Sequence, residues 1–195
     1  MKNRILAVLI ITITLISCDS LQKGLMSTYN MVNCEYTYKS ISGLSISGIN
    51  VSNGLSLTAI PKITSILSGT ATSIPMDFTL NLNVKNPNQS EALMNGLQYI
   101  ISIDGIQFTT GSINQTLSIA SGQTQTLPLS IGFDLATFMK GESKDAVIDI
   151  AKNFVGIGSK KSEVTLKLKP SFKVGTSMVT SPVYIPVSFS FGGTK

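Results

Sequence analysis

The side chains that could carry out chemistry are few in this chain of 195 residues. It has two Cys, ten Asp and Glu together, and no His. Without His, a Ser-His-Asp or Cys-His nucleophile and a His-ligated metal site are excluded. The Asp residues do not follow the spacing of a metal-binding loop, and phosphate-loop and dinucleotide fingerprints are absent. We therefore expect a protein that is not an enzyme and has no catalytic residue, metal or cofactor.

The first seventeen residues have the pattern of a secretion signal. Lys2 and Arg4 precede a run of twelve residues, 5–16, that is interrupted only by Ala and Thr. Twelve residues are too few for a helix that crosses a bilayer, which needs about 20. The length suits the apolar region of a signal peptide. We predict that residues 1–17 are a lipoprotein signal peptide.

Cys18 is the residue to which the sequence assigns a definite chemistry. The residues Leu-Ile-Ser-Cys at 15–18 resemble the bacterial lipobox, whose cysteine is diacylated on sulfur and becomes the new N-terminus. We therefore expect Cys18 to be the site of lipid attachment, with palmitate as the label that would detect it. The alternative is an ordinary signal peptide that is cut near Ser17 and leaves Cys18 as a free thiol.

Lipid attachment predicts a location in the bacterial cell envelope. One acyl chain binds a membrane marginally, whereas two hold a protein there stably. Asp19 follows the cysteine and resembles the inner-membrane retention signal of enteric bacteria, a rule that does not hold in all bacteria. The sequence thus predicts a membrane partner through the N-terminal lipid and leaves the inner and outer membranes open.

The remaining charges argue against nucleic acid as a partner. Residues 18–195 carry thirteen Lys against six Asp and four Glu, a net charge of +3, and they contain no Arg. Such a domain lacks the planar guanidinium that makes bidentate contacts with phosphate or guanine. Five of the Lys lie between residues 160 and 173. We interpret them as a solvated strand face, with an anionic-lipid or nucleic-acid patch as the alternative.

Cys34 has no partner within the protein if Cys18 is acylated on sulfur. Free Cys residues are among the most buried in proteins. We expect Cys34 to be a small buried residue at the edge of the core. The alternative is a reactive or intermolecularly paired thiol.

The elements that carry these residues are expected to be mainly strands. Ser and Thr number 45, which favours strands and turns over long helices. The clearest strand is 74–86, where apolar and polar residues alternate over five pairs. Asp104-Gly105 predicts a hairpin between 97–103 and 106–109. The other strands that we expect are 35–40, 44–51 (with an irregularity at Gly48), 111–119, 124–133, 164–174 and 183–191, the last partly at an edge.

Helical spacing is found in two places. Val147, Ile150, Ala151 and Phe154 fall at i, i+3, i+4 and i+7, which predicts an amphipathic helix from Lys144. A short helix is expected within 55–67. We read residues 18–33 as a tether and 34–195 as a single domain. The predicted fold is an immunoglobulin/fibronectin-like antiparallel β-sandwich with one inserted amphipathic helix.

The segment 74–88 carries a family resemblance. Its alternating strand runs into Asn86-Pro87-Asn88 and is followed by Leu-Gln-Tyr at 97–99, a Gly-containing hairpin and Ile-Ala-Ser-Gly at 119–122. This order resembles the late embryogenesis abundant type-2 proteins, also called the WHy (water stress and hypersensitive response) domain. The resemblance covers 74–134 well, covers 35–73 and 162–191 loosely, and is lost over 135–158.

The resemblance implies a fibronectin-like β-sandwich that protects against desiccation or related stress, and some relatives bind lipid. It implies that Asn86, Pro87 and Asn88 form a structural turn and carries over no catalytic residue. We therefore expect a noncatalytic lipoprotein that protects against stress or binds a ligand or an envelope protein. One alternative is a lipid carrier with its groove between the sheets or under the 144–154 helix. Another is an assembly subunit that adds a β-strand to a partner.

Overall fold

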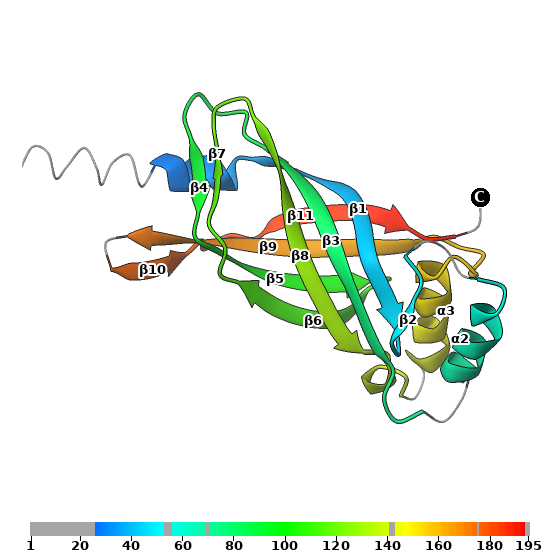
Figure 1. Cartoon of the computed structure of the whole chain (residues 1–195). Coiled ribbons are helices and arrows are strands. Elements are labelled where there is room, and N and C mark those ends of the chain that lie inside the picture. The colour runs from blue at the N-terminus through cyan, green and yellow to red at the C-terminus, as the bar shows by residue number, and fades with distance from the viewer. Residues whose placement is uncertain (1–25, 53–55, 69–70, 141–142, 175, 194–195) are drawn as a thin grey trace, which may run out of the picture.

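Two antiparallel sheets make up most of the described chain and enclose a shared apolar core (Figure 1). The computed structural model describes residues 26–52, 56–68, 71–140, 143–174 and 176–193. The first sheet orders β2 (Ile49–Asn50), β1 (Glu35–Ile46), β3 (Pro75–Lys85) and β8 (Thr124–Asp134). The second orders β10 (Ser177–Thr180), β9 (Ser162–Val174), β5 (Gly96–Ile103) and β6 (Ile106–Ile113), and β11 (Ile185–Phe191) also pairs with β9.

Strand β3 confirms the strongest prediction from the sequence. Its alternating side chains are all buried on one face, because period two places every second residue on the same side of a sheet. These residues are Met76, Phe78, Leu80, Leu82 and Val84. Burying each such side chain stabilises the fold by about 1.5–3 kcal/mol. β3 pairs with β1 and β8 and is therefore the centre of the first sheet.

The predicted hairpin at Asp104-Gly105 joins β5 and β6. Both turn residues have positive φ, 49° and 82°, as a type I′ turn requires. β6 runs to Ile113, beyond the predicted end at 109, and the strand expected over 111–119 is divided between β6 and the short β7 (Leu117–Ile119). β7 pairs with β4 (Ala92–Met94) in a small separate sheet.

The N-terminal strands differ from the prediction. The sequence predicted two strands, 35–40 and 44–51, with Gly43 between them and an irregularity at Gly48. β1 is instead continuous across Gly43, whose φ of 63° accompanies a shift in the register with β3. Ser47 and Gly48, with φ of 48° and 78°, close a tight hairpin between β1 and β2. The glycines thus act in a bulge and a turn, which their positive φ permits.

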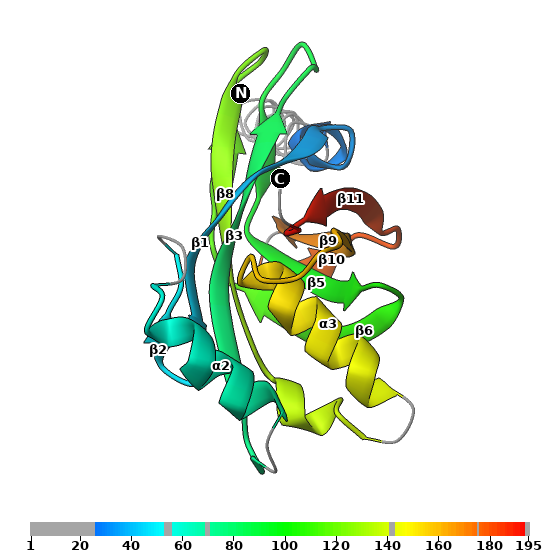
Figure 2. The same cartoon turned by 90° about the vertical axis from the view of Figure 1, so that its right-hand side faces the viewer.

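Two longer helices lie beside each other at one end of the molecule (Figures 1 and 2). α3 (Lys144–Phe154) confirms the predicted amphipathic helix, and α2 (Ala59–Ser68) confirms the short one. Pro61 is the third residue of α2, where the missing N–H has no intrahelical partner to lose. A short 3-10 helix, η1 (Leu135–Thr137), was not predicted.

The mainly β, antiparallel part of the predicted fold is confirmed, and the immunoglobulin or fibronectin subtype stays a prediction. Residues 1–17 and Cys18 lie outside the described residues. Within the described part of the chain, no helix combines the length and the apolar character needed to cross a membrane.

Candidate functional site at the N-terminal end

Residues 26–32 form a helix at the end of the molecule opposite α2 and α3 (Figure 1). The side chain of Met31 is fully buried in the core. The sequence analysis expected a tether over 18–33, and this part of the prediction is wrong for residues 26–33. Ser27, Asn30 and Met31 are buried on one face of the helix, but two of the three are polar, so the apolar residues of this segment show no helical period.

Asn30 fastens this helix to the rest of the domain. Its Nδ2 donates to Ser90 Oγ at 2.7 Å and to the carbonyl oxygen of Glu91 at 2.9 Å. Both acceptors immediately precede β4. Asn30 is nearly buried, so these bonds compete little with water. Sequence reasoning missed Asn30, because a single Asn outside a turn or capping pattern carries no signal of its own.

Asn86 is the centre of the same hydrogen-bond network. Its side chain is fully buried, and its Nδ2 donates to the carbonyl oxygens of Ser90 and Ile119 at 2.9 and 2.8 Å. Its Oδ1 accepts from the backbone N–H of Asn88 at 3.0 Å and from Asn88 Nδ2 at 2.8 Å. One amide side chain thus joins the end of β3 to the segment that precedes β4 and to the last residue of β7.

Asn88 connects this turn to the N-terminal helix. Its Nδ2 also donates to the carbonyl oxygen of Asn30 at 3.0 Å, and its own carbonyl accepts from Ser121 Oγ at 2.7 Å. Pro87, which lies between Asn86 and Asn88, is exposed and has no N–H that would need a partner. The structure therefore brings the three predicted turn residues together with Asn30. We call Asn30, Asn86 and Asn88 the asparagine cluster.

Cys34 and Tyr36 lie below the helix and are shielded from water. Cys34 is buried, as expected, and its thiol donates to the carbonyl oxygen of Asn30. Burial, and to a smaller extent the charge of Glu35, raises the pKa of this thiol to about 11. Tyr36 Oη donates to the carbonyl oxygen of Met31 at 2.8 Å, and burial raises its pKa far above the usual range. At neutral pH the thiol is thus protonated and a poor nucleophile.

The same end carries exposed apolar side chains. They come from the helix and β10, which lie at this end in Figure 1, and from the segment between β10 and β11. They are Met26, Tyr29, Met178, Val179, Val183 and Tyr184. Asn95, which follows β4, holds the start of the β9–β10 hairpin in place. Its Oδ1 accepts from the backbone N–H of Lys173 at 2.9 Å, and its own N–H donates to Ser171 at 2.8 Å. We call the six exposed apolar residues (Met26, Tyr29, Met178, Val179, Val183 and Tyr184) the end patch.

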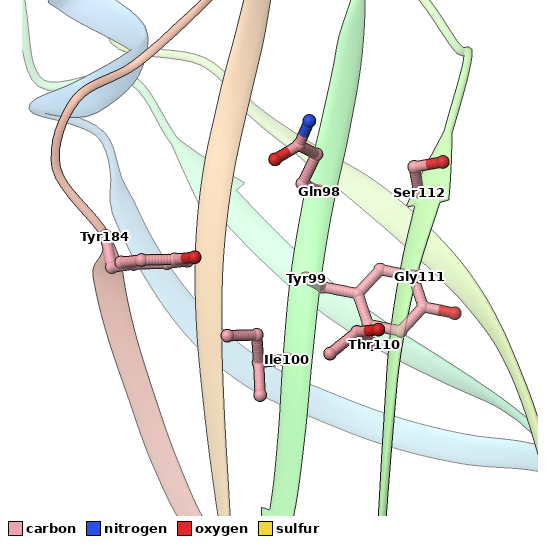
Figure 3. A pocket seen from close by; sticks show the side chains of 7 residues that line it. All are labelled: Gln98, Tyr99, Ile100, Thr110, Gly111, Ser112 and Tyr184. Carbon is pink, nitrogen blue, oxygen red and sulfur yellow. The ribbon is translucent and has the colours of Figure 1, made fainter.

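A shallow hollow of about 390 Å³ lies on the outer face of the second sheet (Figure 3). Seven residues line it: Gln98, Tyr99, Ile100, Thr110, Gly111, Ser112 and Tyr184. None of them is charged. The ring of Tyr99 passes over Gly111, where a Cβ atom would lie 2.4 Å from it, and its hydroxyl donates to the carbonyl oxygen of Ser130. This lining offers hydrogen bonds and a ring edge but no acid, base or activated nucleophile.

The carboxylates are dispersed and serve the fold. Asp104 Oδ1 accepts from the backbone N–H of Glu163, and Asp134 accepts from Ser73 Oγ, Ile74 N and Ala136 N. The Ser73 hydroxyl, followed by the two N–H groups, lowers the pKa of Asp134. Asp77 lines a second hollow of about 280 Å³ without another carboxylate. Among the described residues, no three His, Cys, Asp or Glu side chains lie close enough to hold a metal ion.

The lysines of β9 lie on its solvent side, where the sequence placed them. Leu166 and Leu168 are buried, and Lys167 between them is exposed. Lys169 Nζ lies 4.9 Å from the centre of the Tyr184 ring, a cation–π contact. The alternation therefore follows from the pleat of the strand.

A family model described as late embryogenesis abundant protein matches residues 81–190. The chain belongs to this family. The match starts within β3 and ends within β11, so it includes Asn86 to Asn88. Membership of the late embryogenesis abundant family suggests a stress-related, noncatalytic role. The assignment to the WHy domain and the attachment of lipid remain predictions.

Solved structures of low identity resemble this late embryogenesis abundant chain. A protein from Archaeoglobus fulgidus is 12% identical, with a TM-score of 0.37 over 82% of this chain and 99% of its own. A protein from Arabidopsis thaliana is 10% identical, with a TM-score of 0.44 over 83% of each chain. A solution structure described as a late embryogenesis abundant protein is 14% identical, with a TM-score of 0.39 over 96% of this chain and 89% of its own. No curated protein matches the sequence.

Proposed function

We propose that the protein is a noncatalytic lipoprotein of the bacterial cell envelope, held at a membrane by lipid on Cys18. Its β-rich domain protects against stress at that membrane or binds a ligand or an envelope protein there. The observation that carries this proposal is the docked helix 26–32. The asparagine cluster fixes it to the domain, so the chain that leads back to Cys18 leaves from one defined end.

The chemistry of the described residues supports a role without catalysis. The thiol of Cys34 is buried, and Asp104 and Asp134 accept hydrogen bonds that stabilise turns. The chain has no His. Of the two hollows among the described residues, the larger is lined by no charged side chain, and the smaller holds the single carboxylate of Asp77. We also retain the WHy and fibronectin-like assignments as the finer part of this proposal.

The two alternative functions, a lipid carrier and an assembly subunit, have less support. A lipid carrier needs an apolar groove, yet the rings of Phe78 and Phe191 fill the space against Phe154 of α3, with ring centres 5.6 and 4.8 Å from it. An assembly subunit needs an open strand edge. Pro128 in β8 and Pro186 in β11 each remove an N–H from an outer strand of the described sheets, which leaves β6 as an outer strand without Pro. Mass spectrometry of lipid extracted from natively purified protein would test the carrier.

The lipid anchor is tested by exchanging the two cysteines separately. Cells that express the full chain are labelled with radioactive palmitate, and the mature protein is weighed by mass spectrometry. We expect Cys18→Ala to abolish the label and the mass of the acyl chains. Cys34→Ala is the matched control and should keep both. Labelling that survives Cys18→Ala would refute the anchor.

A further inference from the structure

Exposed apolar side chains are concentrated at one end of this molecule. Seven large apolar side chains are exposed among the described residues, and six of them form the end patch. The seventh, Leu57, is 87% exposed and precedes α2 at the other end. Single exposed apolar residues need no explanation, whereas a group of them indicates an interaction surface. The six residues come from three separate segments of this end, and in β10 the side chains of Met178 and Val179 lie on opposite faces of the hairpin.

The length of chain before the helix keeps the end patch close to the proposed anchor. Eight residues lead from Cys18 to Met26, and a fully extended chain of this length spans at most about 28 Å. The helix itself cannot lengthen the tether without breaking the bonds of Asn30 to Ser90 and Glu91. The asparagine cluster therefore holds Met26 within this distance of the lipid and keeps this end of the domain on the side of the anchor.

The charges around the patch suit an anionic surface. Lys173 is exposed and is directly opposite Met178 in the β9–β10 pair. Lys169 contacts the ring of Tyr184. Of the two carboxylates near this end, Glu35 is paired with Lys85 at 3.2 Å, and Glu91 accepts a hydrogen bond from the neutral hydroxyl of Ser118. Tyr, with an apolar ring and a polar hydroxyl, is favoured where a bilayer meets water, and the patch holds Tyr29 and Tyr184.

We propose that the end patch docks on the surface of an anionic phospholipid bilayer, with Met178 and Val179 between the headgroups and Lys173 against their phosphates. This proposal rests on the lipid anchor at Cys18 and adds an orientation to it. The lipid holds the protein at the membrane, and the patch fixes which end faces the bilayer. α2 and α3 then point away from the membrane.

The chain contains no Trp, so one introduced Trp reports its own surroundings. The experiment uses the mature, lipidated protein in vesicles of phosphatidylethanolamine and phosphatidylglycerol, some of them brominated on the acyl chains. Val179→Trp replaces a residue that is 49% exposed, and Leu57→Trp is the matched control at the far end. Val183→Trp, in the loop before β11, is the second reporter if the first variant does not fold.

We expect brominated lipid to lower the emission of Trp at 179 about twofold, because docked apolar side chains enter roughly 5–10 Å into the interface. Emission from the Leu57→Trp variant should not change. Protein that floats with the vesicles and shows equal or no quenching at both positions would overturn the docking surface and leave the anchor intact. Protein that does not float would overturn the anchor and the orientation with it.

The charge contribution is tested on the Val179→Trp background. Lys173→Glu should reduce the ratio of docked to undocked protein in these vesicles about fivefold or more, since each Lys near an anionic surface contributes on this scale. Lys62→Glu, an exposed residue of α2, is the control and should leave the quenching unchanged. If the two replacements reduced the quenching equally, the position of the charge would not affect docking, and the role of Lys173 would be overturned.

Discussion

The two ends of this domain are stabilised by different interactions. At the α3 end, six Phe rings contact one another in series, with centroid separations from 4.8 to 6.4 Å, and they are Phe78, Phe108, Phe133, Phe138, Phe154 and Phe191. At the N-terminal end, Asn30, Asn86 and Asn88 join four segments by directed hydrogen bonds. Apolar packing closes the first end, and polar bonds fix the second.

The difference indicates how each end meets its surroundings. The burial of apolar area is not directional, and it excludes water. Buried amides fix a position because each bond has a defined length and angle. The N-terminal helix, which buries little apolar surface of its own, needs this second kind of support. The N-terminal end is thus held more by directed hydrogen bonds than by buried apolar area.

The largest effect is expected from the aromatic end. Phe154→Ala removes a buried ring that contacts both Phe78 and Phe191, and such a cavity costs about 3–5 kcal/mol. Urea denaturation followed by circular dichroism measures the loss. Tyr184→Ala, an aromatic residue exposed at the other end, is the control and should stay within about 0.5 kcal/mol. Equal losses would contradict the assignment of the core to this end.

The next effect tests the asparagine cluster. Asn86→Ala leaves the carbonyls of Ser90 and Ile119 without this donor, and we expect a loss of about 2–3 kcal/mol. Hydrogen exchange should show faster exchange in residues 26–32 than the global loss explains, with α3 changed only in proportion to that loss. Asn83→Ala, on the outer face of β3, is the matched control. A uniform change along the chain would mean that the cluster is not a local fastening.

Alkaline pH should weaken the N-terminal end. Burial raises the pKa of Cys34 to about 11 and raises that of Tyr36 further, so folding favours their protonated forms. The stability that these two groups contribute is fully present below their pKa values in the unfolded chain, about 9 to 10. It is lost as the pH rises toward their pKa values in the folded protein. Thermal unfolding between pH 8 and about 11 measures the slope. A Tyr36→Phe, Cys34→Ala double variant should be less stable at pH 8, by about 1–2 kcal/mol, and less sensitive to alkali.

The smallest loss of stability is expected at acid pH, through Asp134 at the α3 end. Hydrogen bonds from Ser73, Ile74 and Ala136 lower the pKa of Asp134, so its contribution is present above about pH 4 and is lost as the pH falls through the folded value. Asp134→Asn should cost at most about 1 kcal/mol at pH 7. It should also reduce the acid slope of the melting temperature. An unchanged slope would show that another carboxylate controls acid unfolding.

Local patterns predicted the elements that depend on few neighbours. The alternation in β3, the Asp104-Gly105 turn and the apolar spacing of α3 each lie within one short segment, and each prediction is confirmed. The same reasoning failed for residues 26–33 and for Gly43 and Gly48. A tether and a docked helix differ in their partners, which lie about sixty residues away at Ser90 and Glu91. Likewise, Gly residues in bulges and in turns have the same local sequence signature.

The sequence by itself determined the antiparallel β content and the amphipathic helix, because periodicity expresses these directly. It also placed Asn86, Pro87 and Asn88 in a turn. Only the tertiary structure decided that this turn holds Asn30, and that the N-terminal helix and β10, with their exposed apolar side chains, lie at one end. Contacts between distant segments depend on how the sheets pair, and no single segment of the sequence encodes that pairing.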